Sequence, residues 1–169
     1  ILIAKNKYAA QQLERQRANH TLSRVYLALT EGHWTDQPRS GLIDRPIAKV
    51  PDCFNRYQIA DTGRPSRTEY KVLSEFTYEE TPFSLVRLKL QTGRTHQIRV
   101  HMASLSHPLL GDSIYGHEGF LGFDRAALHS FEITCQLPGH QDLAVFSSEM
   151  PEDFQKMIAK SINFSSTLI

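Results

Sequence analysis

The sequence has few of the features that mark disulfide-bonded, secreted or membrane proteins. It holds two cysteines, Cys53 and Cys135, and neither belongs to a Cys-x-x-Cys pair, which argues against a disulfide framework and a sulfur-rich zinc site. No apolar run approaches the roughly 20 residues that a bilayer span needs. No charged segment leads into an apolar stretch with a small-residue cleavage site. We therefore expect no membrane partner and a reducing, cytoplasmic setting.

Acidic residues are scarce in two stretches of a chain that is otherwise nearly neutral. The 19 Lys and Arg residues against 18 Asp and Glu residues give a net charge of +1. Residues 1–30 contain Glu14 as their single acid, and residues 83–111 contain none. The second stretch carries cations and histidines instead: Arg87, Lys89, Arg94, His96, Arg99, His101 and His107. This asymmetry favours a basic face that attracts phosphate backbones, and a solvated surface on which the charges interleave is the alternative.

Apolar residues alternate with a period of two in four segments, which predicts strands. These strands are expected over residues 22–30, 84–90 and 126–134, and after the turn at residues 63–65. In the first strand the apolar side comprises Val25, Leu27 and Leu29, so that Tyr26 faces away from it. In the strand after the turn, one face is expected to hold Tyr70, Val72 and Phe76.

Helix signals flank these strands. Helix formers predict a surface helix over residues 7–19, and a period near 3.6 predicts a second helix that Thr95 caps. A last helix from Pro151 is expected to bury Phe154, Met157, Ile158 and Ile162. Residues 32–51 are expected to form a loop with short extended pieces. The predicted fold class is α+β, a mixed, mainly antiparallel sheet flanked by helices, in a single domain over residues 1–169.

Residues 90–101 concentrate cations and hydrogen-bond donors around a glycine turn that leads into a helix. Such a turn suits a phosphate or carboxylate, and Arg94 beside it adds a bidentate donor. Arg99, inside the helix, either holds a buried carboxylate or forms an ion pair at the surface. A zinc site on His96 and His101 is the rival interpretation, but their i, i+5 spacing places the rings about 140° apart, so we expect no metal. His107 and His129 are expected to be structural.

Several motifs together resemble one known family. Residues 90–102 (Leu-Gln-Thr-Gly-Arg-Thr-His-Gln-Ile-Arg-Val-His-Met), 107–112 (His-Pro-Leu-Leu-Gly-Asp) and Tyr115-Gly116 are similar to the signature of the RluA-type pseudouridine synthases. Residues 24–29, 43–47 and 63–68 agree with it in order and spacing. The resemblance implies a pseudouridine synthase catalytic-domain fold that acts on ribosomal or transfer RNA. It implies breakage of the C1′–N1 bond of a uridine and reattachment through C5, without a cofactor.

The resemblance also assigns roles to particular residues. Tyr26 matches a tyrosine that stacks on the base and takes up the C5 proton, and Arg99 matches an arginine that pairs with the catalytic aspartate. Lys89, Arg94 and His96 are the expected RNA-binding residues. A flipped uridine costs a few kcal/mol of unstacking, which basic contacts to the RNA backbone offset.

One part of the family pattern is missing from the 169 residues. The catalytic aspartate of the family belongs to a His-Arg-Leu-Asp stretch, and this stretch does not occur here. The chain opens at Ile1 inside an apolar run, so we expect it to lack the N-terminal part with that aspartate and to be inactive alone. The alternatives are a non-catalytic RNA-binding module with the same fold and, more distantly, an enzyme built on the histidines. A monomer is expected.

Overall fold

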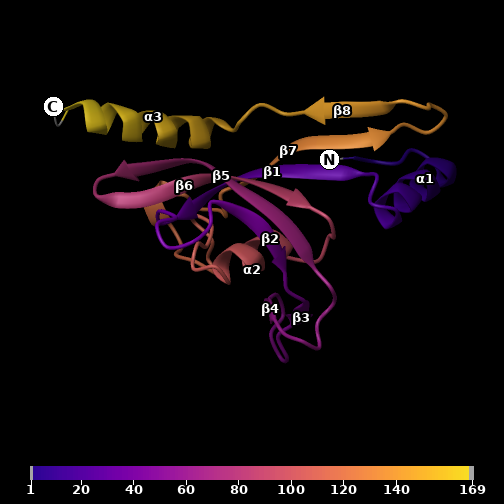
Figure 1. Ribbon diagram of the computed structural model, residues 1–169, viewed down its shortest axis with the longest axis horizontal. Coiled ribbons are helices and arrows are strands. Elements are labelled where there is room, and N and C mark those ends of the chain that lie inside the picture. The colour runs from indigo at the N-terminus through magenta and orange to yellow at the C-terminus, as the bar shows by residue number, and fades with distance from the viewer. Residues whose placement is uncertain (1, 168–169) are drawn as a thin grey trace.

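A six-stranded antiparallel sheet forms the centre of the computed structural model, which describes residues 2–167 (Figure 1). The strands lie side by side in the order β2-β5-β6-β1-β7-β8. Their bounds are β1 Ser23–Glu31, β2 Ser40–Asp44, β5 Arg67–Tyr78, β6 Thr81–Leu90, β7 Leu128–Gln136 and β8 Leu143–Ser147. The helices are α1 Lys7–Ala18, α2 Gln97–Ala103 and α3 Glu152–Thr167, with a short 3-10 helix at Phe120–Gly122. The α+β, mainly antiparallel architecture expected from the sequence is confirmed.

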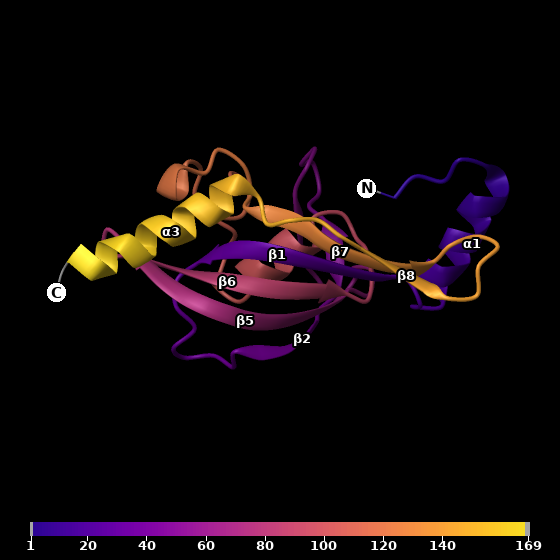
Figure 2. The same cartoon turned by 90° about the horizontal axis from the view of Figure 1, so that it is seen from above.

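The two faces of the sheet are covered by different helices. Figure 1 shows α2 on one side and α3 on the other, and Figure 2 shows α3 crossing one end of the sheet. The core on the α2 side includes Ala28, Leu88 and Ile98, and the core on the α3 side includes Leu29, Phe83 and Phe154. Because a core lies on each side of the sheet, both faces of β1 are buried over residues 27–30. The expectation of a strand with one apolar side is therefore too simple for β1.

A bulge in β5 overturns another expectation from the period of two. Val72 pairs with Val86, but the next pair joins Ser74 to Leu85, so Leu73 is the extra residue. Beyond the bulge the side chains change faces. Tyr70 and Val72 consequently lie in the core on the α2 side, whereas Phe76 stacks on Phe83 in the core on the α3 side.

The helices follow the sequence pattern except at two points. The side chain of Asn6 caps α1 by accepting a hydrogen bond from the backbone N–H of Ala9 at 2.8 Å. Helix α3 buries Phe154 and Met157 as expected, but Ile162 is 56% exposed, and Ser161 is buried in its place. Thr95 does not cap α2, since the residue before that helix is His96 and no side chain caps it. No helix in the described part of the chain is long and apolar enough to cross a membrane.

A small hairpin projects from the sheet on the side of α2. Strands β3 (Ile47–Lys49) and β4 (Tyr57–Ile59) form it, and Figure 1 shows it below the sheet. The chain returning from β4 passes directly against β3, where Ile47 and Arg64 exchange two backbone hydrogen bonds. A Cβ atom at Gly63 would lie 2.5 Å from the carbonyl carbon of Ile47, so only glycine permits this approach.

Candidate active site

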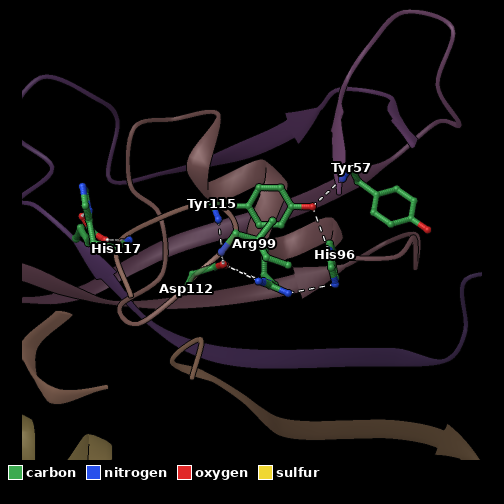
Figure 3. A network of polar contacts seen from close by, with 8 residues as sticks. Tyr57, His96, Arg99, Asp112, Tyr115 and His117 are labelled. Carbon is green, nitrogen blue, oxygen red and sulfur yellow. Dashed lines mark hydrogen bonds and ion pairs between the residues drawn. The ribbon is translucent and has the colours of Figure 1, made fainter. Parts of the chain in front are cut away.

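Arg99 is held from two sides by residues that flank α2 (Figure 3). Its Nε donates to Oδ2 of Asp112 at 2.7 Å and its Nη2 to Oδ1 at 2.5 Å, while Nη1 lies 3.1 Å from Nε2 of His96. The guanidinium carbon lies 5.1 Å from the centroid of the Tyr115 ring. Two of its five N–H groups have no acceptor within residues 2–167, and 18% of the side chain is exposed. Arg99 can therefore donate two further hydrogen bonds to a group that reaches it.

Asp112 is the buried carboxylate that anchors Arg99. It is 0% exposed, and its Oδ1 also accepts hydrogen bonds from the backbone N–H groups of Ile114 and Tyr115. Burial alone would raise the pKa of Asp112, but the hydrogen bonds from Arg99 and the two backbone groups outweigh it and lower the pKa. The hydrogen bond with Asp112 raises the pKa of Arg99 in turn. Of the two alternatives for Arg99, the structure thus supports the buried carboxylate over the surface ion pair.

The other edge of Arg99 belongs to a network of rings. His96 Nδ1 lies 3.0 Å from the hydroxyl oxygen of Tyr115, and the backbone N–H of Tyr57 donates to the same oxygen at 2.9 Å. The His96 ring meets the rings of Tyr57 and Tyr115 edge to face, each at 5.6 Å. Burial, followed by the charge of Arg99, lowers the pKa of His96. The hairpin, the start of α2 and the loop after α2 therefore converge on one oxygen atom.

Tyr26 lies on the same side of the sheet as this network. Its register partner in β6 is Leu88, and Tyr26 packs, partly buried, against the core on the α2 side. Because side chains alternate along β1, Tyr26 shares its face with Ala28, so that face is also apolar. The hydroxyl of Tyr26 makes no hydrogen bond to another of the described residues. Tyr26 thus packs on the side of the sheet that α2 covers, and none of the hydrogen bonds of Arg99 within residues 2–167 goes to it.

A cleft of about 500 Å³ opens between the hairpin, the end of α1 and the turn before α2. We call it the basic cleft, because four cations line it and no acid does among the described residues: Arg17, Lys49, Arg64 and Arg94. The Nε of Arg94 donates to the carbonyl of Pro65 at 3.2 Å. Neutral partners of this kind leave the positive charge uncompensated, so the cleft suits phosphate groups.

Gln97, and not Thr95, fixes the turn that forms one wall of the cleft. Its Oε1 accepts from the backbone N–H of Arg94 at 3.0 Å and from the hydroxyl of Thr92 at 2.8 Å. Its Nε2 donates to the carbonyl of Arg67 at 2.9 Å. The Gln97 side chain is buried, with 2% exposed. In the sequence, the signal for this role is a polar side chain next to the apolar stripe of α2.

Lys89 lies apart from the other expected RNA-binding residues. It neighbours Leu88, which faces α2, so its side chain leaves β6 on the opposite face. It lines a separate cleft together with Asp44 and Glu69, and Glu69 is its cross-strand partner. The structure therefore brings Arg94, His96 and Arg99 to one region and Tyr26 to the same side, but not Lys89.

Three other histidines, His101, His107 and His129, contact groups of the protein itself. His101 is fully buried between Thr68 and the carbonyl of Arg45, and His107 contacts the carbonyl of Glu31 and stacks on Trp34. His129 lies 3.4 Å from the carbonyl of Ser148. The described residues contain no group of three His, Cys, Asp or Glu side chains that could hold a metal ion.

Comparisons with known proteins place this arrangement in a family. The model of the RNA pseudouridylate synthase family matches residues 1–104, more than half of the chain, and the matched part includes Tyr26, Arg94, His96 and Arg99. The chain belongs to the RNA pseudouridylate synthase family. Asp112 and Tyr115 lie outside the matched range.

Curated members of the family resemble nearly all of the chain. Ribosomal large subunit pseudouridine synthase D of Nitrosomonas europaea is 34% identical over 166 residues, which cover 94% of this chain and 46% of that protein. RNA pseudouridine synthase YhcT of Bacillus subtilis is 38% identical over 157 residues, covering 93% of this chain and 50% of that protein. The chain thus spans about half the length of these relatives.

A solved structure supports the same fold. Human RNA pseudouridylate synthase domain containing 1 superposes with a TM-score of 0.73 at 31% identity, and the match covers 93% of this chain and 66% of that chain.

Asp112, Tyr115 and Gln97 are members of the site that the sequence pattern alone does not identify. Asp112 is the last residue of the motif at residues 107–112, but nothing in that motif pairs it with Arg99.

Proposed function

We propose that this chain supplies the RNA-binding cleft and part of the active site of an enzyme that isomerises uridine to pseudouridine in ribosomal or transfer RNA. The observation that carries the proposal is Arg99, anchored by Asp112, with two N–H groups left to donate. A second carboxylate can accept those two hydrogen bonds in the fork geometry that a guanidinium favours. That carboxylate is the aspartate that the His-Arg-Leu-Asp stretch supplies in the family, which residues 1–169 do not contain.

The basic cleft provides the affinity for RNA in this proposal. Lys49, Arg64 and Arg94 bind phosphates, and this term offsets the few kcal/mol needed to flip a uridine out of its stack. The uracil then lies on the α2 side of the sheet near Tyr26. The C1′–N1 bond breaks and the C1′–C5 bond forms. The proton on C5 passes to the Tyr26 hydroxyl and on to water, and N1 takes up a proton from water, so that the product is an isomer of uridine. Lys89, on the other face, is left with a minor share of RNA binding, and neither a metal nor a cofactor takes part.

Release of tritium from RNA labelled at uridine C5 tests the proposal, because only cleavage of the C5–H bond sends the label to water. We expect none from the 169-residue chain and steady release when the same chain carries an upstream segment with the family's aspartate stretch. Release by the 169-residue chain alone would refute the assignment to an aspartate outside it. RNA binding without release by the longer protein would favour the non-catalytic module.

Paired hydroxyl deletions separate chemistry from folding in that assay. Tyr26→Phe keeps a ring that stacks on the base but removes the proton acceptor, so the rate should fall by roughly 10² to 10⁴, the usual contribution of a general base. Tyr70→Phe is the matched control, since its hydroxyl donates to the carbonyl of Pro38, away from the site. A Tyr26→Phe protein as fast as Tyr70→Phe would remove Tyr26 from the mechanism.

A further inference from the structure

The protons in the Arg99 network can be placed from the donor and acceptor rules alone. A guanidinium only donates, so Nε2 of His96, 3.1 Å from Arg99 Nη1, must accept. A neutral imidazole carries one proton, which therefore sits on Nδ1 and is donated to the hydroxyl oxygen of Tyr115. The backbone N–H of Tyr57 donates to the same oxygen. The hydrogen bonds thus connect the hairpin to Arg99 through the Tyr115 oxygen, on which they converge from both sides. The donor and the acceptor are fixed at each contact.

His101, on the same helix, has the opposite tautomer by the same rules. Its Nε2 lies 3.0 Å from the carbonyl of Arg45, which only accepts, so Nε2 carries the proton. Its Nδ1, 2.9 Å from the Thr68 hydroxyl, accepts. The two histidines, His96 before α2 and His101 within it, therefore provide an internal comparison, since the His101 contacts do not involve the hairpin strand β4 or Arg99.

The hairpin strand β4 reaches the Arg99 network through Tyr57. The N–H of Tyr57 points at Tyr115, while the neighbouring Lys49 of β3 lines the basic cleft, as does Arg64 beside Ile47. Cations that bind RNA and the donor that touches the network thus belong to one hairpin with its returning strand. Displacement of this hairpin would remove one of the two hydrogen bonds that fix the Tyr115 oxygen, and with it part of the support for the His96 ring.

We propose that His96 and Tyr115 are positioning residues that couple the β3–β4 hairpin to Arg99, so that RNA bound along the hairpin fixes the guanidinium for the reaction. The role of this coupling in a reaction rests on the proposed function. The hydrogen bonds that form the coupling do not depend on it. The charged and titratable groups that face His96 are Arg99 on α2, Asp112 and Tyr115 in the loop after it, and Tyr57 on β4. A protonated His96 would direct an N–H at Arg99, so the network requires the neutral ring.

Nitrogen NMR of the 169-residue chain with ¹⁵N-labelled histidine tests the proton placement without any assay of activity. We expect His96 with its proton on Nδ1 and His101 with its proton on Nε2. A His96 ring protonated on Nε2 would overturn the proposal, whatever the protein does to RNA. If the longer protein with the aspartate stretch released no tritium while the 169-residue chain showed the two opposite tautomers, the proposed function alone would be refuted.

Hydrogen exchange at the Tyr57 amide then tests the coupling itself. Tyr115→Phe removes the acceptor, so the Tyr57 amide should exchange roughly fivefold or more faster, the factor expected when one hydrogen bond is removed. The ring signals of His96 should shift and those of His101 should not. Tyr70→Phe, which deletes a hydroxyl elsewhere, should leave both unchanged. Addition of a uridine-containing stem–loop RNA should slow Tyr57 exchange in the unaltered chain and not in Tyr115→Phe, and equal slowing in both would overturn the coupling.

Discussion

Arg99 and the cations of the basic cleft differ in how their charge is balanced before any substrate arrives. Arg99 is paired with a buried carboxylate, lies over a tyrosine ring and contacts a histidine, so its orientation is set. Lys49 and Arg64 line the cleft without forming an ion pair to an acid elsewhere in residues 2–167. The contacts of Arg99 fix the orientation of its guanidinium and restrict its motion. The cations of the basic cleft attract anions without being held in one orientation.

This difference matches two tasks that the proposed function would require of the protein. Phosphate contacts hold the nucleic acid and carry no information about the reacting atom, and they weaken as salt rises. A donor held in one orientation, such as the guanidinium of Arg99, forms hydrogen bonds only with a group at one position. Salt weakens these hydrogen bonds much less, because the side chain is partly buried. We therefore expect variants of the two regions to fail in different ways, and the following experiments test that distinction.

The largest effect is expected from Arg99→Ala. The variant leaves Asp112 fully buried without its cation, and breaking a buried pair in this way costs roughly 3–5 kcal/mol of unfolding free energy. Urea unfolding of the 169-residue chain, followed by circular dichroism, measures the loss. The control is Arg125→Ala, whose pair with Asp153 is exposed and should contribute less than about 1 kcal/mol. Equal losses in the two variants would show that Arg99 is not held as the geometry indicates.

Much of this fold follows from the sequence, and the exceptions have physical causes. The period of two locates β1, β5, β6 and β7, because these strands lie in the interior of the sheet and bury apolar side chains. It cannot reveal the bulge at Leu73, since a single extra residue leaves the local composition unchanged. Strand β8 is absent from the predicted strands, although Leu143, Val145 and Phe146 form a short apolar run between polar stretches.

The candidate site is only partly predictable for a similar reason. Arg94, His96 and Arg99 stand close together in one motif, and the motif places them correctly at a turn and a short helix. Two of the partners that give Arg99 its orientation, Asp112 and Tyr115, come from a loop 13 and more residues later in the chain, and nothing in the local pattern links them to it. The burial of Asp112 decides the pairing, and burial depends on how the chain packs after Leu110.

Charge removal in the basic cleft should give the second largest effect, on RNA affinity and not on stability. Replacing Lys49 or Arg64 with alanine should weaken binding of a stem–loop RNA and reduce the slope of log K against log salt by about one for each phosphate that is no longer bound. Filter binding at several salt concentrations measures both. Lys156→Ala removes an exposed cation from α3 on the other side of the sheet and should change neither. A slope that stays constant in the cleft variants would argue against phosphate binding there.

The smallest effect is expected from pH, through His96 and His101. Burial lowers the pKa of His96 and of His101 on folding. Between the ordinary value of about 6.5 and the lowered values, the unfolded chain binds protons that the folded chain does not, so stability falls as the pH drops below about 6.5.

His96→Asn removes one of the two contributions, and asparagine tolerates the left-handed φ of 55° at this position. Urea unfolding at pH 7.5 and 5.5 should therefore show a smaller loss in this variant than in the unaltered chain. His140→Asn, in an exposed loop, should retain the full loss. If the His96→Asn variant also retained the full loss of stability at low pH, the proton responsible would bind at another residue. The neutral His96 ring would then not distinguish the Arg99 network from the basic cleft.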